Sequence, residues 1–152
     1  MIGLICAVAI AASVHNANVV CQAEEELYRI AEDHDIPWEV LVAIGIHESR
    51  WTVSAVNPKT GARGIFQQIP RWSPLGWRDL STLQGSLDGL WHTLDWIRSW
   101  PRAGQTIPEI LCTYGTGKAR WCQSRMSGNQ YSRVVERISG ELFLLSAMME
   151  ER

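Results

Sequence analysis

One apolar segment constrains this chain more than any other, the stretch PWEVLVAIGI that runs from Pro37 to Ile46. We predict a helix here, because Pro37 suits the first helical turn and most of the residues after it are apolar. At helical spacing, Leu41, Ile44 and Glu48 share one face. Glu48 therefore continues an apolar face, and we expect its carboxyl group to be partly buried.

A carboxyl group in this position is expected to keep its proton to a higher pH than usual. Burial disfavours the charged form, and so does the negative end of the helix dipole, which lies near Glu48. Both effects raise the pKa of Glu48. A carboxyl that stays protonated near neutral pH can act as the general acid that cleavage of a glycosidic bond requires. An ordinary glutamate at the solvent edge of a helix is the alternative that this spacing leaves open.

The rest of the chain has helical patterns and no strand pattern. Residues 22–34 form an acidic amphipathic segment, and the run from Ser81 to Gln84 has the form of a capping box that opens a helix. A short helix is predicted to start at 106–109 and lead to Tyr114. Apolar residues recur every three or four positions in two longer segments: Leu83, Leu87, Leu90, Leu94 and Ile97, and Tyr131, Val135, Ile138, Leu142 and Leu145. With 152 residues, 46% of them hydrophobic, the chain is predicted to be mainly α with one core.

The first 14 residues, MIGLICAVAIAASV, are uncharged and apolar. Such a run is too short to span a bilayer comfortably and is typical of a signal peptide. We predict a leader over residues 1–23, with small residues at Ala17 and Ala23 as cleavage points, and a domain over 24–152. The protein is then exported, to the periplasm or the extracellular space. Because no Lys or Arg precedes the run, a retained membrane anchor is the alternative, and a first core helix is favoured less.

Composition and motifs argue against several classes of function. The net charge of −2 and the lack of a basic run argue against nucleic-acid binding. The sequence has no Cys/His spacing of the zinc type and no glycine-rich phosphate loop, so we expect no metal and no cofactor.

Three motifs and a tyrosine follow one another along the chain. They are Glu48-Ser49 at the end of the apolar helix, Gly61-Ala62-Arg63-Gly64-Ile65-Phe66-Gln67, Thr113-Tyr114-Gly115-Thr116-Gly117, and Tyr131 at the start of the last helix. In this order and at these separations, over about residues 25 to 140, the chain resembles the soluble lytic transglycosylase family. The lytic transglycosylases of this family are lysozyme-like and related to goose-type lysozyme.

The resemblance implies a lysozyme-like helical domain with a cleft for the glycan strands of peptidoglycan. It implies that Glu48 is the catalytic residue, and that substrate contacts come from Ser49, Phe66, Gln67, Tyr114 and Tyr131. Two positions depart from the family pattern: Phe66 replaces a methionine, and Gly115 stands where the family usually has an asparagine. A place in a secretion system or in phage assembly also fits such an enzyme.

The supply of carboxylates bears on the reaction type. Ordinary glycoside hydrolysis uses two carboxyl groups, and the candidates for a second one are Asp79, Asp88 and Asp95, none of which lies in a motif. The resemblance implies a one-carboxyl reaction, in which Glu48 acts as acid and then as base and a 1,6-anhydro-N-acetylmuramic acid end forms. A hydrolytic muramidase of the lysozyme type and a non-catalytic glycan-binding module are the alternatives.

Cysteines and tryptophans complete the set of candidate residues. In an oxidising compartment, a bridge between Cys112 and Cys122 would restrain the segment around Tyr114. Cys122 could instead be free or pair with Cys21, which the sequence alone leaves open. Among the eight tryptophans, Trp51, Trp72 and Trp77 fall in or near the expected cleft loops, where aromatic faces suit sugar rings.

Overall fold

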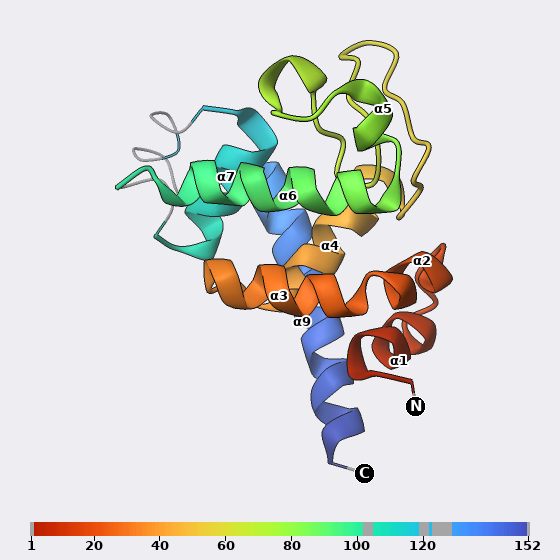
Figure 1. The fold of residues 1–152 in the computed structure, drawn as a ribbon. Helices are drawn as coiled ribbons and strands as arrows, with labels where there is room; N and C mark the ends of the chain where they lie inside the picture. The colour runs from red at the N-terminus through yellow and green to blue at the C-terminus, as the bar shows by residue number, and fades with distance from the viewer. Residues whose placement is uncertain (1, 102–104, 119–121, 123–128, 152) are drawn as a thin grey trace.

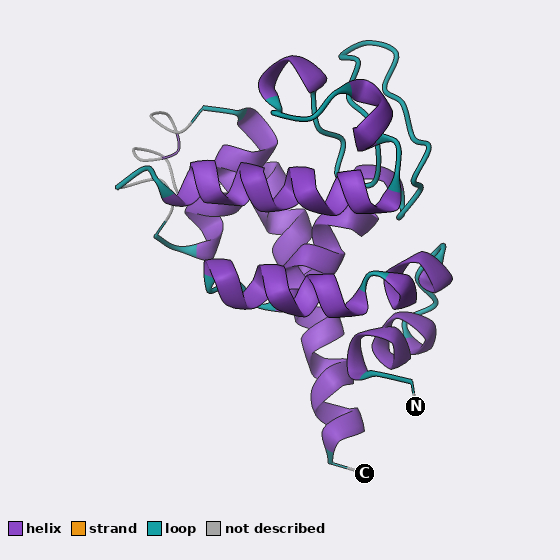
Figure 2. Ribbon diagram, in the orientation of Figure 1, coloured by secondary structure: helices purple, strands orange, loops and turns teal. Residues whose placement is uncertain are grey.

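The computed structural model describes residues 2–101, 105–118, 122 and 129–151 (Figure 1). Over these residues the fold is mainly α, as the sequence predicts, and Figure 2 shows no strand in them. Extended backbone pairs there only in two isolated bridges, Val56 with Arg63 and Arg63 with Gln68.

The described helices include the two whose apolar periodicity is clear in the sequence, over residues 83–98 and 130–150, and others that periodicity did not predict. They are α1 (Leu4–Ala11), α2 (Ala17–Gln22), α3 (Glu24–His34), α4 (Trp38–Ser49), α5 (Trp77–Leu80), α6 (Leu83–Arg98), α7 (Ile107–Thr116) and α9 (Gln130–Glu150), with the short 3-10 helix η1 (Pro70–Trp72).

Helix α4 forms the centre of the core. It packs against α3 on one side and α9 on the other, while α6 and α7 close the core above them (Figure 1). All residues from Glu39 to Gly45 are buried, and Leu41 and Ile44 have no exposed surface. A helix that is apolar on all sides is stable only in such a place, and each fully buried leucine or isoleucine contributes about 1.5–3 kcal/mol.

Local sequence signals set the helix starts. Thr106 caps α7 in a capping box with Glu109, at the start that the sequence predicts. The predicted box at Ser81 is wrong in register: Thr82 is the N-cap of α6 and its side chain accepts a hydrogen bond from Gly85 N. Gly85 has no side chain to return the bond, so α6 begins with a single cap.

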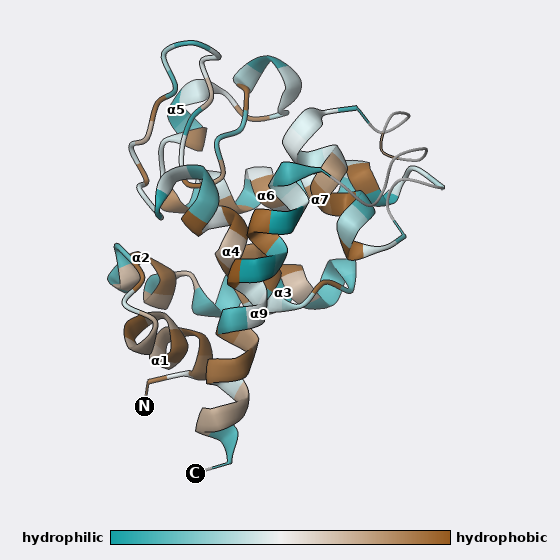
Figure 3. Cartoon of the chain, turned by 180° about the vertical axis from the view of Figure 1, so that it is seen from behind, coloured by the Kyte–Doolittle hydropathy of each residue, from teal (hydrophilic) through white to brown (hydrophobic). Residues whose placement is uncertain are grey.

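The first two helices pack on the domain as a hairpin. Ile5 and Val8 of α1 are buried in the core, α1 contacts α2 and α9, and a disulfide joins Cys6 to Cys21. Figure 3 shows how apolar α1 is. Residues 4–11 are therefore a core helix in this structure, the arrangement that the sequence favours least. A leader or anchor over residues 1–23 stays a prediction, and its removal would take this hairpin away.

A second disulfide joins Cys112 to Cys122, as predicted, and Cys21 does not pair with Cys122. Two disulfides fit a chain that folds in an oxidising, exported environment. None of the helices in the described ranges has the length and apolar character needed to cross a membrane.

The segment between α4 and α6, residues 50–82, forms a lobe of loops and short helices at one end of the molecule (Figure 1). We call it the loop lobe. Gly64 lies at its base with a φ of +75°, and a Cβ there would collide with the carbonyl of Leu80. Only glycine fits this position, because both the backbone angle and the close approach exclude a side chain.

Candidate active site

Glu48 lies in the last turn of α4, where that helix meets the first turn of α9. The hydroxyl of Tyr131 donates a hydrogen bond of 2.7 Å to Glu48 Oε1. Tyr131 is placed by the N-cap of α9, where the Asn129 side chain accepts from the backbone N–H groups of Tyr131 and Ser132. The two residues are 83 positions apart in the chain, and the packing of α4 on α9 brings them together.

The environment of Glu48 favours the protonated form of its carboxyl group more than water does. Burial raises the pKa of Glu48, as the sequence predicts, and the Tyr131 hydrogen bond opposes part of that increase by stabilising the carboxylate. Glu48 thus has a raised pKa and one well-placed donor for its charged state. This combination suits a group that gives up a proton and later recovers it.

Two tyrosines border the carboxyl group. Tyr114 and Tyr131 stack with their ring centroids 6.1 Å apart. Burial, and next the charge of Glu48, raise the pKa of each tyrosine well above its ordinary value. Both phenols therefore stay protonated. Tyr131 uses its proton on Glu48, and Tyr114 donates to the carbonyl oxygen of Phe66 at 2.8 Å.

Gly115 explains how Tyr131 comes so close to α7. A Cβ on Gly115 would lie 2.5 Å from Cγ of Tyr131 and 2.9 Å from its Cβ, so any side chain would displace the tyrosine ring at its root. Gly115 also lies inside α7, while the loop expected around Tyr114 is the last turn of this helix. The glycine at the family's asparagine position thus makes room for the tyrosine that contacts Glu48.

Ser49 holds the loop lobe against the end of α4, and Gln67 braces the lobe internally. The Ser49 hydroxyl donates to the carbonyl of Ile65 at 2.7 Å and accepts from Thr52 N at 3.0 Å. The amide nitrogen of Gln67 donates to the carbonyl of Gly64 at 3.0 Å. Both side chains bond to nearby backbone in this structure, and a contact from either to substrate stays a prediction.

The aromatic residues at the base of the lobe are packed inside. Phe66 was expected to line the cleft, but its side chain is only 1% exposed and meets the Trp51 ring edge-on. Trp51 has no exposed surface, and its indole N–H donates to Val42 O. Neither ring is available to a sugar. Phe66 instead contributes its backbone carbonyl, which fixes the hydroxyl of Tyr114.

Sequence reasoning missed two residues of this region. The His47 ring packs edge-on against Tyr131, with ring centroids 4.9 Å apart, and partial burial of this ring lowers the pKa of His47. Asn16 donates to Arg50 O, just after Glu48-Ser49, and to the Thr52 hydroxyl. His47 adjoins Glu48 in sequence, which was a signal of proximity. Nothing in the sequence connects Asn16 to α4.

No second carboxylate accompanies Glu48. The physical causes of its raised pKa include no acidic neighbour. Glu39 begins the same helix and lies roughly 13 Å away along its axis, and Glu109 is bound into the cap of α7. The segments that the structure does not describe contain no Asp or Glu. Within the described ranges, no cluster of side chains could hold a metal ion either.

A groove of about 470 Å³ lies on another side of α4, between the α1–α2 turn and α9. Ile46 and Arg50 line it, whereas Glu48 does not.

Comparisons with protein-family models, curated proteins and solved structures found no match to this chain.

Proposed function

We propose that this protein is a lytic transglycosylase of peptidoglycan with a lysozyme-like helical domain, and that Glu48 is its single acid and base. The observation that carries the proposal is the hydrogen bond between the Tyr131 hydroxyl and a buried Glu48 whose pKa is raised. The order of the motifs from Glu48-Ser49 to Tyr131 supports the same conclusion. So does the lack of a second carboxylate close to Glu48.

The reaction needs one carboxyl group that acts twice. Protonated Glu48 donates its proton to the glycosidic oxygen between N-acetylmuramic acid and N-acetylglucosamine, and the bond from that oxygen to C1 breaks. The carboxylate then takes the proton of the C6 hydroxyl of the muramic acid. The C6 oxygen forms a bond to C1, which gives the 1,6-anhydro sugar and restores protonated Glu48. Water is neither consumed nor released.

The neighbouring groups have matching roles in this cycle. Tyr131 stabilises the carboxylate between the two proton transfers, through the bond that lowers the Glu48 pKa. Tyr114 keeps the segment around Phe66 in place beside the reacting ring. Ser49 orients the end of α4, and the amide oxygen of Gln67 is the atom of that side chain that would accept from a sugar. The lowered pKa of His47 disfavours a positive charge beside Glu48.

Mass spectrometry of digested peptidoglycan tests the proposal directly. Fragments that end in 1,6-anhydro-N-acetylmuramic acid are expected, whereas a hydrolytic muramidase would leave reducing ends that are heavier by one water. Substitution Glu48→Gln should lower turnover by about 100- to 10,000-fold, the usual contribution of a general acid or base. Retained glycan binding without cleavage by the unaltered protein would instead show a binding module.

The pH dependence of turnover is a second test of the role of Glu48. Because the acid must be protonated and its pKa is raised, turnover should persist above the range in which an ordinary glutamate ionises. It should then fall as the pH rises through the Glu48 pKa. Turnover by Glu48→Gln close to that of the parent would remove Glu48 from the chemistry.

A further inference from the structure

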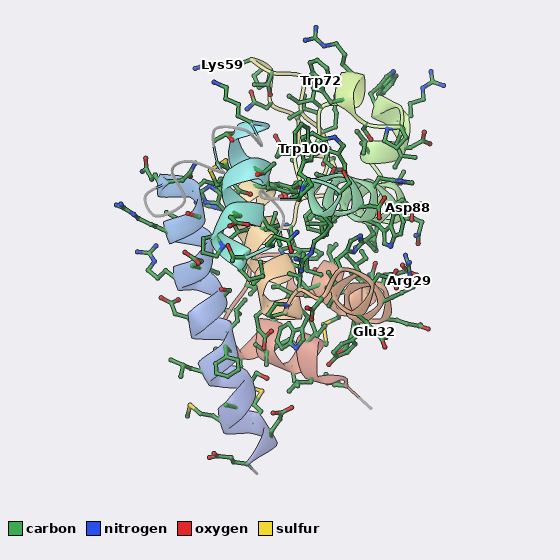
Figure 4. The ribbon with its side chains drawn as sticks, turned by 90° about the vertical axis from the view of Figure 1, so that its left-hand side faces the viewer. Arg29, Glu32, Lys59, Trp72, Asp88 and Trp100 are labelled. Carbon is green, nitrogen blue, oxygen red and sulfur yellow. A yellow bond between two sulfur atoms is a disulfide. The ribbon has the colours of Figure 1, made fainter. Side chains whose placement is uncertain are left out.

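The loop lobe carries an excess of positive charge. It holds five basic residues, Arg50, Lys59, Arg63, Arg71 and Arg78, and one acidic residue, Asp79. Helix α3 has the opposite balance, with five acidic residues and one basic residue, in a chain whose net charge is −2. In Figure 4, Lys59 and Trp72 lie at the lobe end, while Arg29 and Glu32 lie on α3, away from it. The basic loop lobe and the acidic helix α3 thus lie in different parts of the molecule.

The positive charges of the lobe are not neutralised within the fold. The ion pairs among the described residues are those of Arg29 with Glu26 and with Asp33, both on α3. Arg71 and Arg78 are exposed, and Arg63 Nε is buried without a hydrogen-bond partner among the described residues. The exposed guanidinium groups of Arg71 and Arg78 are therefore available to an external anion.

Exposed tryptophans orient these guanidinium groups. Arg71 lies over the Trp72 ring at 4.7 Å, and Arg78 and Arg63 lie over the Trp77 ring at 5.1 and 5.5 Å. Trp72 and Trp77 are 74% and 52% exposed. A guanidinium that lies against an aromatic face keeps its N–H edge free for hydrogen bonds. That edge matches the two oxygens of a carboxylate.

The lobe is fastened to the candidate active site. Ser49, next to Glu48, bonds to Ile65, and Tyr114 bonds to Phe66. These two contacts fix the base of the lobe beside the carboxyl group. The basic and aromatic surface therefore belongs to the same lobe whose base adjoins the carboxyl group.

We propose that Arg63, Arg71 and Arg78, held on Trp72 and Trp77, bind the carboxylate groups of the peptides that a peptidoglycan strand carries. This inference rests on the proposed function and extends it, because it makes the enzyme selective for strands that bear acidic peptides. Carboxylates are favoured over an anionic lipid surface for one reason. The tryptophan rings are partly covered by guanidinium groups, whereas insertion among lipids needs free rings.

Binding to purified peptidoglycan sacculi tests this in the full chain with Glu48→Gln, so that the sacculi stay intact. The pair Arg71→Gln and Arg78→Gln should weaken binding by about tenfold, since two exposed charge contacts are removed. Amidation of the free carboxyl groups of the sacculi should weaken binding of the Glu48→Gln protein with intact arginines to a similar degree. Raised salt should do the same. The pair Arg133→Gln and Arg137→Gln, exposed on α9, makes the same charge change and should leave binding unaltered.

Three results would overturn the inference. One is equal binding by the Arg71, Arg78 variant and its parent, with thermal unfolding confirming that both are folded. Another is equal binding to amidated and untreated sacculi. The third is an arginine-dependent affinity for vesicles of anionic phospholipid that exceeds the affinity for sacculi, which would assign the surface to a membrane. Because no cleavage occurs in this assay, its failure leaves the transglycosylase proposal to be decided by product analysis.

Discussion

At the scale of single residues, the contact between Glu48 and Tyr131 depends on the absence of a side chain at Gly115. Helix propensity favours alanine over glycine inside α7 by about 1 kcal/mol. Overpacking against the root of Tyr131 costs about 1–3 kcal/mol and moves the ring. The second effect is the larger, because the clash involves Cβ and Cγ of Tyr131, which cannot move without the backbone of α9.

We therefore expect Gly115→Ala to lower kcat by about 100-fold, the scale of a displacement near 1 Å, with a smaller change in KM. The measurement is steady-state release of anhydro fragments. Tyr131→Phe, which lacks only the hydroxyl, is the matched comparison. Adding Gly115→Ala to Tyr131→Phe should cause little further loss if both act through that hydroxyl. Full activity in Gly115→Ala would contradict this account.

Residue-scale prediction from sequence succeeded where a single helix decided the outcome. The spacing of Leu41, Ile44 and Glu48 correctly predicted a partly buried carboxyl group with a raised pKa. The partner of Glu48 could not be predicted from spacing, because Tyr131 lies on another helix. Phe66 shows the same limit. Its apolar character was clear from sequence, but only the packing on Trp51 decides that its ring points inward.

At the scale of elements, the periodic helices were predictable and the first helix was not. Regular three- and four-residue spacing located α6 and α9, and the predicted helix start at 106–109 located α7. An apolar run without polar residues fits both a leader and a buried helix, because neither needs a polar side that faces solvent. In the structure the run is a buried helix with Cys6 paired to Cys21, and a cysteine partner is not encoded in local sequence. Whether these residues are also a leader stays a prediction.

The hairpin of α1 and α2 should contribute to the stability of the domain. Its disulfide closes a loop over a sequence separation of 15 residues, which corresponds to about 3 kcal/mol of unfolding free energy. The double substitution Cys6→Ser and Cys21→Ser should lower the free energy of unfolding in urea by about that amount. Because neither cysteine is a residue of the candidate active site, kcat under folding conditions should change little.

Reductant provides the control for the hairpin prediction. It should destabilise the parent more than the Cys6→Ser, Cys21→Ser variant, because the variant has only the Cys112–Cys122 bridge left to lose. Equal stability of variant and parent would show that the hairpin is not coupled to the rest of the fold.

At the scale of the whole molecule, the candidate site is maintained at the expense of stability. Glu48 and Glu39 both have a pKa raised by burial, so the folded state penalises their charged forms. The stability that the neutral forms contribute is complete below the unfolded-state pKa, near pH 4.5. It is lost as the pH rises through the raised folded-state values. A functional carboxyl in an apolar setting thus makes the fold weaker at neutral pH than it would be without the charge.

Substitution Glu48→Gln should therefore raise the unfolding temperature at pH 7 while it removes most of the turnover. Glutamine keeps the shape of the side chain and an oxygen that accepts from Tyr131, but it has no charge to bury. At pH 4 the parent carboxyl is protonated in both states, so the unfolding temperatures of the two proteins should converge. Glu32→Gln on the exposed face of α3 is the matched control and should shift the unfolding temperature little at either pH. A Glu48→Gln protein less stable than its parent at pH 7 would mean that the carboxylate is stabilised in the fold, and Glu48 would then be unsuited to act as an acid.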